Sequence, residues 1–270
     1  MIRLILSLVL LYSLPSFSKD GKKSDSEYSL WEDTKSSFFL LIEGSYTQFK
    51  TRSNLYYLGA SIPSLYWAFE EDVRIKDLTF SKDIKKPVEI VGELGVVMSF
   101  PVIPLSSWYI AKSQKNNHLR QFAIEYAATV YLALAESGLL SFIEVHERPT
   151  SQNISFWEEA FRGDSSWPSG HVIPYMALFY KTLQFYGPYW AIIPAALTYF
   201  GSLQRLQDGK HWTSDVVASF FLTAFAAEGV RAANKYKDND PFYKWMFEHE
   251  VRLGVLRYER AWGPRVSLSF

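Results

Sequence analysis

The sequence predicts an all-α protein, a bundle of about six core helices, whose C-terminal end could add a short strand pair. The first observation behind this prediction is that apolar residues recur at helical spacing through most of the chain. The second is that alternation of apolar and polar residues, the pattern of a half-buried strand, is confined to 251–258 and 265–270. The length of 270 residues supports one sizeable core and therefore a single domain.

The composition excludes several classes of protein. Lys plus Arg and Asp plus Glu both total 28 residues, so the formal net charge is zero, whereas nucleic-acid-binding proteins normally carry a basic excess. The absence of cysteine excludes disulfides, thiolate metal sites and a cysteine nucleophile. Aromatic residues make up 17% of the chain, which suits a large core or a membrane interface.

The first 18 residues predict a secretory signal peptide. Arg3 supplies a short positive region, Leu4 to Leu14 form a mostly apolar run, and the small residues Ser16 and Ser18 suit a cleavage site. An uncleaved N-terminal anchor is the alternative, although the run is shorter than the roughly 20 residues of a comfortable transmembrane helix. In both cases we expect an exported protein, periplasmic or membrane-associated.

The rest of the chain divides into a leader, a helical domain and an extension. Charged residues without periodicity predict a flexible leader, and helical patterns then continue to the end of the last long predicted helix. The predicted boundaries are 19–36 for the leader, 37–236 for the helical domain and 237–270 for the C-terminal extension.

The first half of the helical domain is the harder half to interpret. Residues 37–48 and 54–69 are rich in aromatic residues, and their type of structure stays open. The charged residues 70–87 predict a loop that ends at a proline. Residues 88–111 form the most apolar run, and two prolines within it should kink or divide a helix there.

The second half shows clearer helical patterns. A long apolar stripe predicts a helix over 118–145, which ends just before Arg148 and Pro149, and the polar residues 150–167 predict a loop. The remaining helices are expected at 169–185, 189–206 and 211–236. Their apolar stretches are of borderline length for a bilayer and contain charged residues, so a membrane-embedded bundle and a soluble bundle both remain open.

A group of residues in this half suits a phosphate-binding site. Arg148 and Arg205 can each offer a planar fork of donors with a permanent charge. Ser169 offers a hydroxyl, and Gly170 lets the backbone approach a ligand closely. If a helix begins there, the backbone N–H groups of residues 169–171 would face the anion.

Two histidines could supply the chemistry. His211 and Asp215 are spaced i,i+4, so the carboxylate can fix the imidazole tautomer and leave the other ring nitrogen free to attack phosphorus. His171 could protonate the leaving group and then activate water. The residues therefore predict a double displacement through a phosphohistidine that needs no metal.

The same residues resemble the superfamily of type 2 phosphatidic acid phosphatases, bacterial class A acid phosphatases and vanadium haloperoxidases. That family has three ordered motifs, which this chain matches at Arg148-Pro149, at Pro168 to His171, and at Arg205 with His211 and Asp215. The resemblance implies an all-helical fold and the roles given above. It also implies that vanadate could bind as a phosphate mimic, with no other cofactor expected.

Two positions depart from the family pattern. Ser141 stands where the family has a phosphate-binding lysine, and Gln204 stands where it has a serine. Three residues could substitute for the missing cation, namely His146, Lys210 and Lys112. If His146 does not do so, we expect it to be solvated or packed. We expect His118 and His249 to be surface residues.

We therefore predict an exported phosphatase that acts on phosphate monoesters or pyrophosphates. Lipid-linked substrates are favoured by the export signal, the apolar helices and the aromatic content, and they imply a membrane partner and a site on the periplasmic side. The alternatives are a soluble, broad-specificity periplasmic acid phosphatase, a vanadate-dependent haloperoxidase, and a non-catalytic envelope protein that retains the fold.

Overall fold

The computed structural model describes residues 28–81, 83–150, 165–247, 250–258 and 261–269. Eight long helices make up the described body of the chain, which confirms the all-α prediction and exceeds the six expected core helices. They are α2 (Leu30–Thr47), α3 (Arg52–Thr79), α4 (Lys86–Ser99), α5 (Val102–Gln114), α6 (Asn117–Leu140), α8 (Ile173–Tyr186), α9 (Pro188–Gln207) and α10 (Thr213–Ala233). The predicted signal peptide lies outside the described residues.

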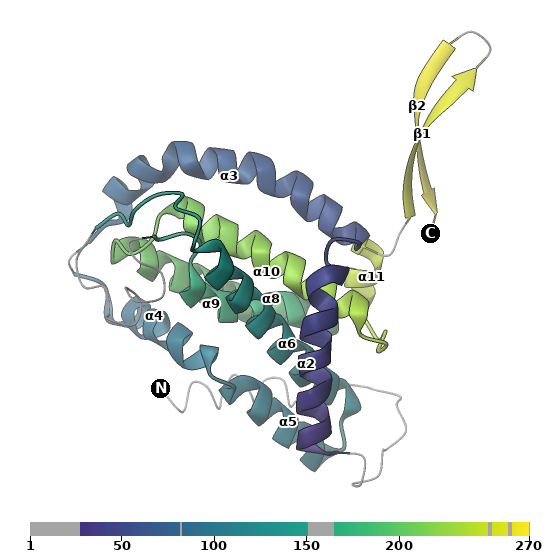
Figure 1. The fold of residues 1–270 in the computed structure, drawn as a ribbon, viewed down its shortest axis with the longest axis horizontal. Helices are drawn as coiled ribbons and strands as arrows, with labels where there is room; N and C mark the ends of the chain where they lie inside the picture. Colours follow the sequence, from purple (N-terminus) through teal and green to yellow (C-terminus); the bar gives the residue numbers. More distant parts are fainter. Residues whose placement is uncertain (1–27, 82, 151–164, 248–249, 259–260, 270) are drawn as a thin grey trace.

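Helix α10 is the centre of the bundle (Figure 1). It packs against α2, α3, α6 and α8, while α9 covers α8 and α4. The largest cluster of buried side chains joins α4, α5, α6 and α8, and it includes Leu94, Phe122 and Tyr175. This arrangement sets the N-terminus of α10 beside the short turn that precedes α8, where the predicted site residues lie.

Helix α2 begins inside the predicted leader. Ser29 caps it by accepting a hydrogen bond of 3.4 Å from the backbone N–H of Glu32. Asp33 is 3% exposed and accepts hydrogen bonds from Arg120 Nε and Trp108 Nε1, both at 2.7 Å. The prediction of a flexible leader through residue 36 is therefore wrong from Leu30 onward, because a buried ion pair fixes this part of the chain to α5 and α6.

Helix α3 occupies most of the segment expected to be a loop. It continues to Thr79, so residues 70–79 are helical. Their charged residues are compatible with a helix because most of them face solvent, as in the i,i+3 ion pair of Glu71 and Arg74. Asp72 is the exception, since it is only 6% exposed and contacts α10.

The expected division of the most apolar run is confirmed. Helix α4 ends at Ser99 and α5 begins at Val102, with Pro101 at the N-cap position of α5. The two helices meet at 69°. The close approach of α4 to the site elements depends on Gly95, because a Cβ there would lie 2.5 Å from the backbone oxygen of His171.

The C-terminal extension contains a helix and the expected strand pair. Helix α11 spans Pro241–Phe247. Strands β1 (Glu250–Tyr258) and β2 (Ala261–Ser269) are antiparallel, with Glu250 opposite Ser269. Figure 1 shows this hairpin extending away from the helices.

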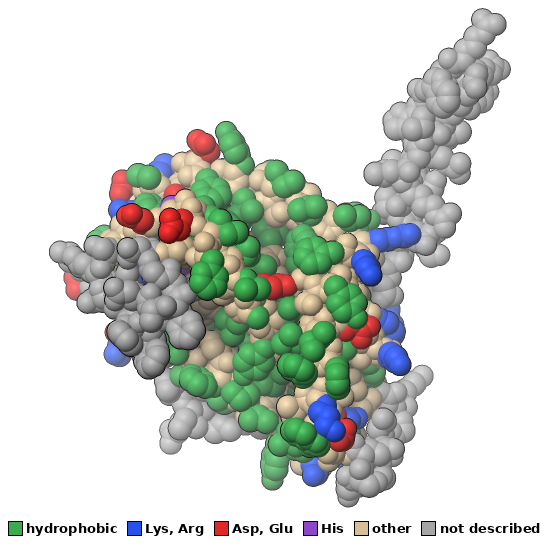
Figure 2. All heavy atoms as spheres, viewed as in Figure 1, with side chains coloured by type: hydrophobic (Ala, Val, Ile, Leu, Met, Phe, Trp, Pro, Cys, Tyr) green, Lys and Arg blue, Asp and Glu red, His purple; other side chains and the backbone are tan. Residues whose placement is uncertain are grey.

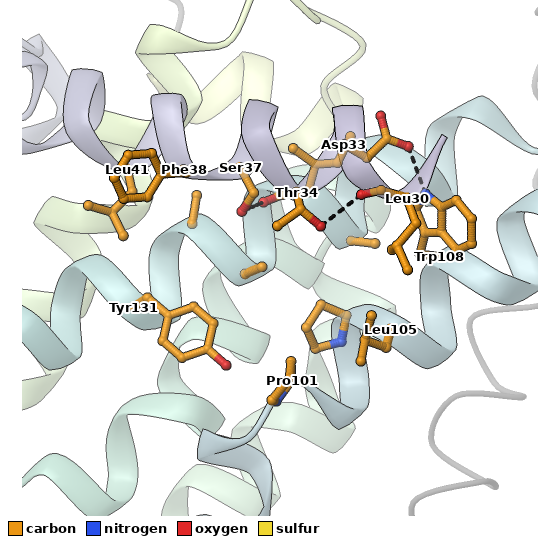
Figure 3. Close-up of a pocket in the computed structure, with 15 residues that line it drawn as sticks. Leu30, Asp33, Thr34, Ser37, Phe38, Leu41, Pro101, Leu105, Trp108 and Tyr131 are labelled. Carbon is orange, nitrogen blue, oxygen red and sulfur yellow. Dashed lines mark hydrogen bonds between the residues drawn. The ribbon is translucent and has the colours of Figure 1, made fainter. Parts of the chain in front are cut away.

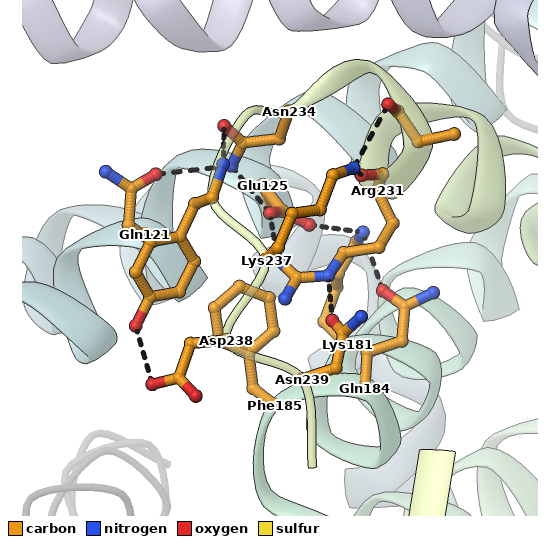
Figure 4. A network of polar contacts seen from close by, with 12 residues as sticks. Gln121, Glu125, Lys181, Gln184, Phe185, Arg231, Asn234, Lys237, Asp238 and Asn239 are labelled. Atoms are coloured by element: carbon orange, nitrogen blue, oxygen red, sulfur yellow. Dashed lines mark hydrogen bonds and ion pairs between the residues drawn. The ribbon is translucent and has the colours of Figure 1, made fainter. Parts of the chain in front are cut away.

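A buried ion cluster ties α6, α8 and α10 together at the C-terminal end of α10 (Figure 4). Lys181 and Glu125 are both fully buried, and Lys181 Nζ lies 2.9 Å from Glu125 Oε2. Arg231 pairs with the other oxygen of Glu125 and lies 4.4 Å from the centre of the Phe185 ring. Asn234 donates to the same carboxylate at 2.6 Å. We name Glu125, Lys181 and Arg231 the ion cluster.

The described helices give only a weak indication of a membrane span. Helix α10 is long and apolar enough to cross a bilayer, and α4 with α5 would pass as one broken span. However, 56% of the apolar window of α10 is buried inside the protein, as in the core helix of a bundle. The outward faces of α2 and α3 carry many exposed aromatic and aliphatic side chains (Figure 2). Among them are Phe38, Phe39, Tyr46, Ile62, Tyr66 and Trp67.

Candidate active site

The three motif segments meet at the N-terminal end of α10. The segment with Arg148 is tied to the turn between α9 and α10, because Thr150 donates its backbone N–H to Gly209 O at 3.1 Å. Gly209 has φ +64°, a left-handed conformation that favours glycine. Trp212 Nε1 donates to Glu147 O at 2.7 Å. These contacts bring Arg148 to the side of α10 on which His211 lies.

The second motif forms a loop and a single 3₁₀ turn, Gly170–Val172, ahead of α8. The backbone N–H of Ser169 donates to Asp215 O at 3.3 Å, and Ser219 Oγ donates to Ser169 O at 2.8 Å. The N–H of Ser169 is therefore committed to α10, which corrects the expectation that it faces an anion. The hydroxyl of Ser169 is buried and has no hydrogen-bond partner among the described residues, so it can serve a ligand.

The surroundings of His211 fix its tautomer. Nδ1 lies 2.9 Å from the backbone oxygen of Ser166 and 3.3 Å from Asp215 Oδ2. A carbonyl oxygen can only accept, so Nδ1 carries the proton and Nε2 keeps its lone pair. Nε2 is buried and has no partner among the described residues. His211 lies two residues before α10 instead of on its face, and Asp215 reaches it from the first turn of the helix.

Burial lowers the pKa of His211 below its ordinary value, although Asp215 acts in the opposite direction. The positive charges of the Arg148 and Arg205 guanidinium groups also lower that pKa. The imidazole is therefore neutral at neutral pH. A neutral ring with a free Nε2 beside two cations is suited to attack an anionic phosphorus centre.

His171 lies beside His211. Their ring centres are 6.3 Å apart and the ring planes are inclined by 57°. His171 is partly exposed, whereas His211 is 2% exposed. The His171 ring can therefore contact the leaving group or water, whereas the His211 ring is enclosed. Arg148 and Arg205 are themselves only 8% and 5% exposed.

The structure adds His146 to the site. Its Nδ1 lies 2.9 Å from Ser166 Oγ, and its Nε2 lies 3.1 Å from Ser214 Oγ and 3.5 Å from Asp215 Oδ1. His146 therefore contacts the carboxylate on the side opposite to His211. The expectation that His146 is merely solvated or packed is wrong, and its place two residues before Arg148 was the only available signal.

Asp72 of α3 extends the same network. Its two oxygens accept from Ser214 N at 2.9 Å and Ser214 Oγ at 2.6 Å. Burial raises the pKa of Asp72 above its ordinary value despite these hydrogen bonds. No sequence signal could have placed Asp72 here, because it lies 142 residues from Ser214 in a segment predicted to be a loop.

The two departures from the family pattern have different outcomes. Gln204 accepts from Arg205 Nε and packs on Gly92 of α4, where a Cβ would lie 2.4 Å from its side chain. It thereby orients Arg205. Ser141 is 3% exposed and donates to Gly138 O at 2.7 Å, so it supports the end of α6.

Both lysines considered as substitutes are engaged elsewhere, and the expectation for His118 also changes. Lys210 pairs with Asp208 at 2.9 Å, and Lys112 lies over the Trp108 ring. His118 is 7% exposed and contacts Phe185 O at 3.1 Å, so it is a core residue and not a surface one. His249 lies outside the described residues.

The comparisons agree with this geometry. Residues 141–238 match the model of the PAP2 superfamily, a span that contains all three motif segments. The match supports a phosphatase in general. Comparisons with curated proteins and with solved structures found no match.

Proposed function

With residues 141–238 assigned to the PAP2 superfamily, we propose that this protein is a metal-independent phosphatase that uses His211 as its nucleophile. The observation that carries the proposal is the state of His211. Its Nδ1–H is held by Ser166 O, and its buried Nε2 faces no described partner. The positive charges of Arg148 and Arg205, which both act on the His211 ring, support the binding of an anion beside that nitrogen.

The first step transfers the phosphoryl group to the protein. His211 Nε2 attacks phosphorus and forms a P–N bond, while the P–O bond to the leaving alcohol breaks. The departing oxygen takes a proton from His171. The guanidinium groups and Ser169 Oγ stabilise the charge on the three equatorial oxygens, and Asp215 stabilises the positive charge that develops on the ring.

The second step releases inorganic phosphate. His171, now neutral, takes a proton from water, and the water oxygen attacks phosphorus as the P–N bond breaks. The partial exposure of His171 supports this role, because the residue that meets water should be the accessible one. Both histidines thereby return to the protonation states in which they started.

We further propose that the substrates are phosphate monoesters or pyrophosphates linked to a lipid, cleaved on the periplasmic side of the membrane. The support is the exposed aromatic surface of α2 and α3, since Tyr and Trp favour membrane interfaces. A soluble acid phosphatase of broad specificity is the alternative. Relative turnover of a water-soluble ester and a lipid phosphate in mixed micelles decides between the two.

The decisive experiment uses His211→Ala and His171→Ala with p-nitrophenyl phosphate. We expect His211→Ala to lose at least ~10³-fold in turnover with an unchanged circular dichroism spectrum. His171→Ala should still release one nitrophenol per protein, because this leaving group needs little protonation, and should then stop as the phosphoenzyme. Unchanged turnover in His211→Ala would overturn the mechanism.

A further inference from the structure

An apolar cavity lies between α2, α5 and α6, away from the histidines (Figure 3). Its volume is about 410 Å³. The wall consists almost entirely of carbon, apart from the paired Asp33 at one end. Its lining includes Phe38, Leu41, Leu105, Trp108, Ala127 and Tyr131.

A second cavity of about 260 Å³ lies next to the site. Its lining includes Val96 of α4, Leu134 and Gly138 of α6, and His171. Gly138 contributes space there, because nothing lies within 4 Å of the position that its Cβ would occupy. Because His171 lines this cavity, the leaving group of a substrate would lie against its apolar wall.

The two cavities follow one another along the same elements. Tyr131 lines the first and Leu134 the second, at i,i+3 spacing on one face of α6. On the opposite wall, Ser99 lines the second cavity and Pro101 the first, on either side of the break between α4 and α5. From Ala127 to Gly138 the track runs about 16 Å at the helical rise per residue.

We propose that this track binds the hydrocarbon tail of the substrate while its phosphate lies at His211. The inference rests on the proposed function and specifies its substrate class, a phosphate ester with one extended alkyl chain. A volume of about 410 Å³ falls in the range of small-molecule pockets, roughly 300–1,000 Å³. This volume is too small for a partner helix, which is about 10–12 Å across.

The kinetic test compares hexadecyl phosphate with butyl phosphate in a fixed neutral detergent. Burial of the longer tail should give the wild type a kcat/KM for hexadecyl phosphate ~100-fold higher, which corresponds to about three to four methylenes more deeply buried in the protein than in the detergent, at about fourfold each. Ala127→Trp fills the first cavity and should raise KM for hexadecyl phosphate at least tenfold, with butyl phosphate unaffected. Ala127→Leu should give a smaller change in the same direction and serves if the tryptophan variant does not fold.

The matched control is Ala196→Trp, which places the same side chain on an exposed position of α9 outside both cavities. It should leave both substrates unchanged. Equal effects of Ala127→Trp and Ala196→Trp on hexadecyl phosphate would overturn the track. Hydrolysis of neither substrate by the wild type would instead overturn the proposed function.

A second measurement locates the tail without turnover. Hexadecyl phosphonate brominated at the chain end should quench the fluorescence of Trp108, which lines the far part of the track. The quenching of Trp108 is obtained by subtracting the quenching measured in Trp108→Phe from that of the wild type. Ala127→Trp should abolish this quenching of Trp108. Quenching that is identical in Trp108→Phe and the wild type would place the tail elsewhere and overturn the inference.

Discussion

The two ends of α10 carry buried polar clusters of opposite design. At the C-terminal end, the ion cluster gives both oxygens of Glu125 a cation and gives Lys181 three oxygen acceptors. At the N-terminal end, two cations lie near a neutral imidazole whose Nε2 has no described partner. The two ends are about 25–30 Å apart at the helical rise per residue.

This difference distinguishes buried polar groups that stabilise the fold from buried polar groups that can bind a ligand. Buried charges are stable when they are paired and hydrogen-bonded, and then they hold elements in one arrangement. A site that binds an anion must instead leave donors available before the anion arrives. The ion cluster thus orients α10 against α6 and α8, and the opposite end of the same helix presents Asp215 to His211.

Among the variants that keep the His211 nucleophile, the largest expected effect on activity comes from Asp215→Asn. It removes the negative charge that stabilises the His211 ring, so turnover should fall by about 10³–10⁴-fold. Because Asp215 raises the pKa of His211, its loss lowers that pKa further. Activity requires the neutral ring and is lost as pH falls through its pKa, so the acidic limb of the kcat/KM profile should move to lower pH.

The matched control for this variant is Asp208→Asn, which neutralises a partly exposed carboxylate paired with Lys210. It should retain most of the activity and the same acidic limb. Unfolding midpoints of both variants should stay close to the wild type. An Asp215→Asn protein with wild-type turnover would show that His211 does not act through this carboxylate.

Loss of a charge from the ion cluster should lower the stability of the protein and leave its activity nearly unchanged. Lys181→Met leaves Glu125 buried with one cation fewer, and we expect a loss of about 3–5 kcal/mol in the free energy of unfolding. Turnover per folded molecule should change little. Denaturant unfolding measures the first quantity and active-site titration the second, with Lys112→Met on the exposed face of α5 as the neutral control. Equal stability of the two variants would contradict the comparison.

The contrast also explains which features the sequence could predict. Arg148, Ser169, Arg205 and His211 could be predicted as one candidate site because their residue types and order are specific and local. Asp72 could not be found, since a charged stretch looks like a loop until α3 packs against α10. Likewise, Ser29 and Asp33 belong to a polar segment, and only the distant Arg120 reveals that α2 begins there.

A smaller effect is expected at His146, whose Nε2 lies 3.5 Å from Asp215 Oδ1, the carboxylate oxygen that His211 does not contact. We regard it as a positioning residue, so His146→Ala should lower kcat by ~10–100-fold while KM stays within about twofold. His146→Gln keeps groups able to bond Ser166 and Ser214 and should recover part of kcat. A fall in stability with kcat unchanged would show that His146 is structural only.

The smallest expected effect is a gain, from Ser141→Lys. Ser141 lies at the C-terminal end of α6, three residues after Gly138, which lines the cavity beside His171. A lysine there meets the negative end of the helix dipole and can reach a phosphate bound next to His171. We expect kcat/KM to be preserved or to rise by up to about tenfold, measured with p-nitrophenyl phosphate. Ser141→Met supplies similar length without charge and should give no gain. A sharp fall with lysine but not with methionine would mean that this pocket has been rebuilt around the loss of the cation, with Arg148 and Arg205 alone holding the phosphate.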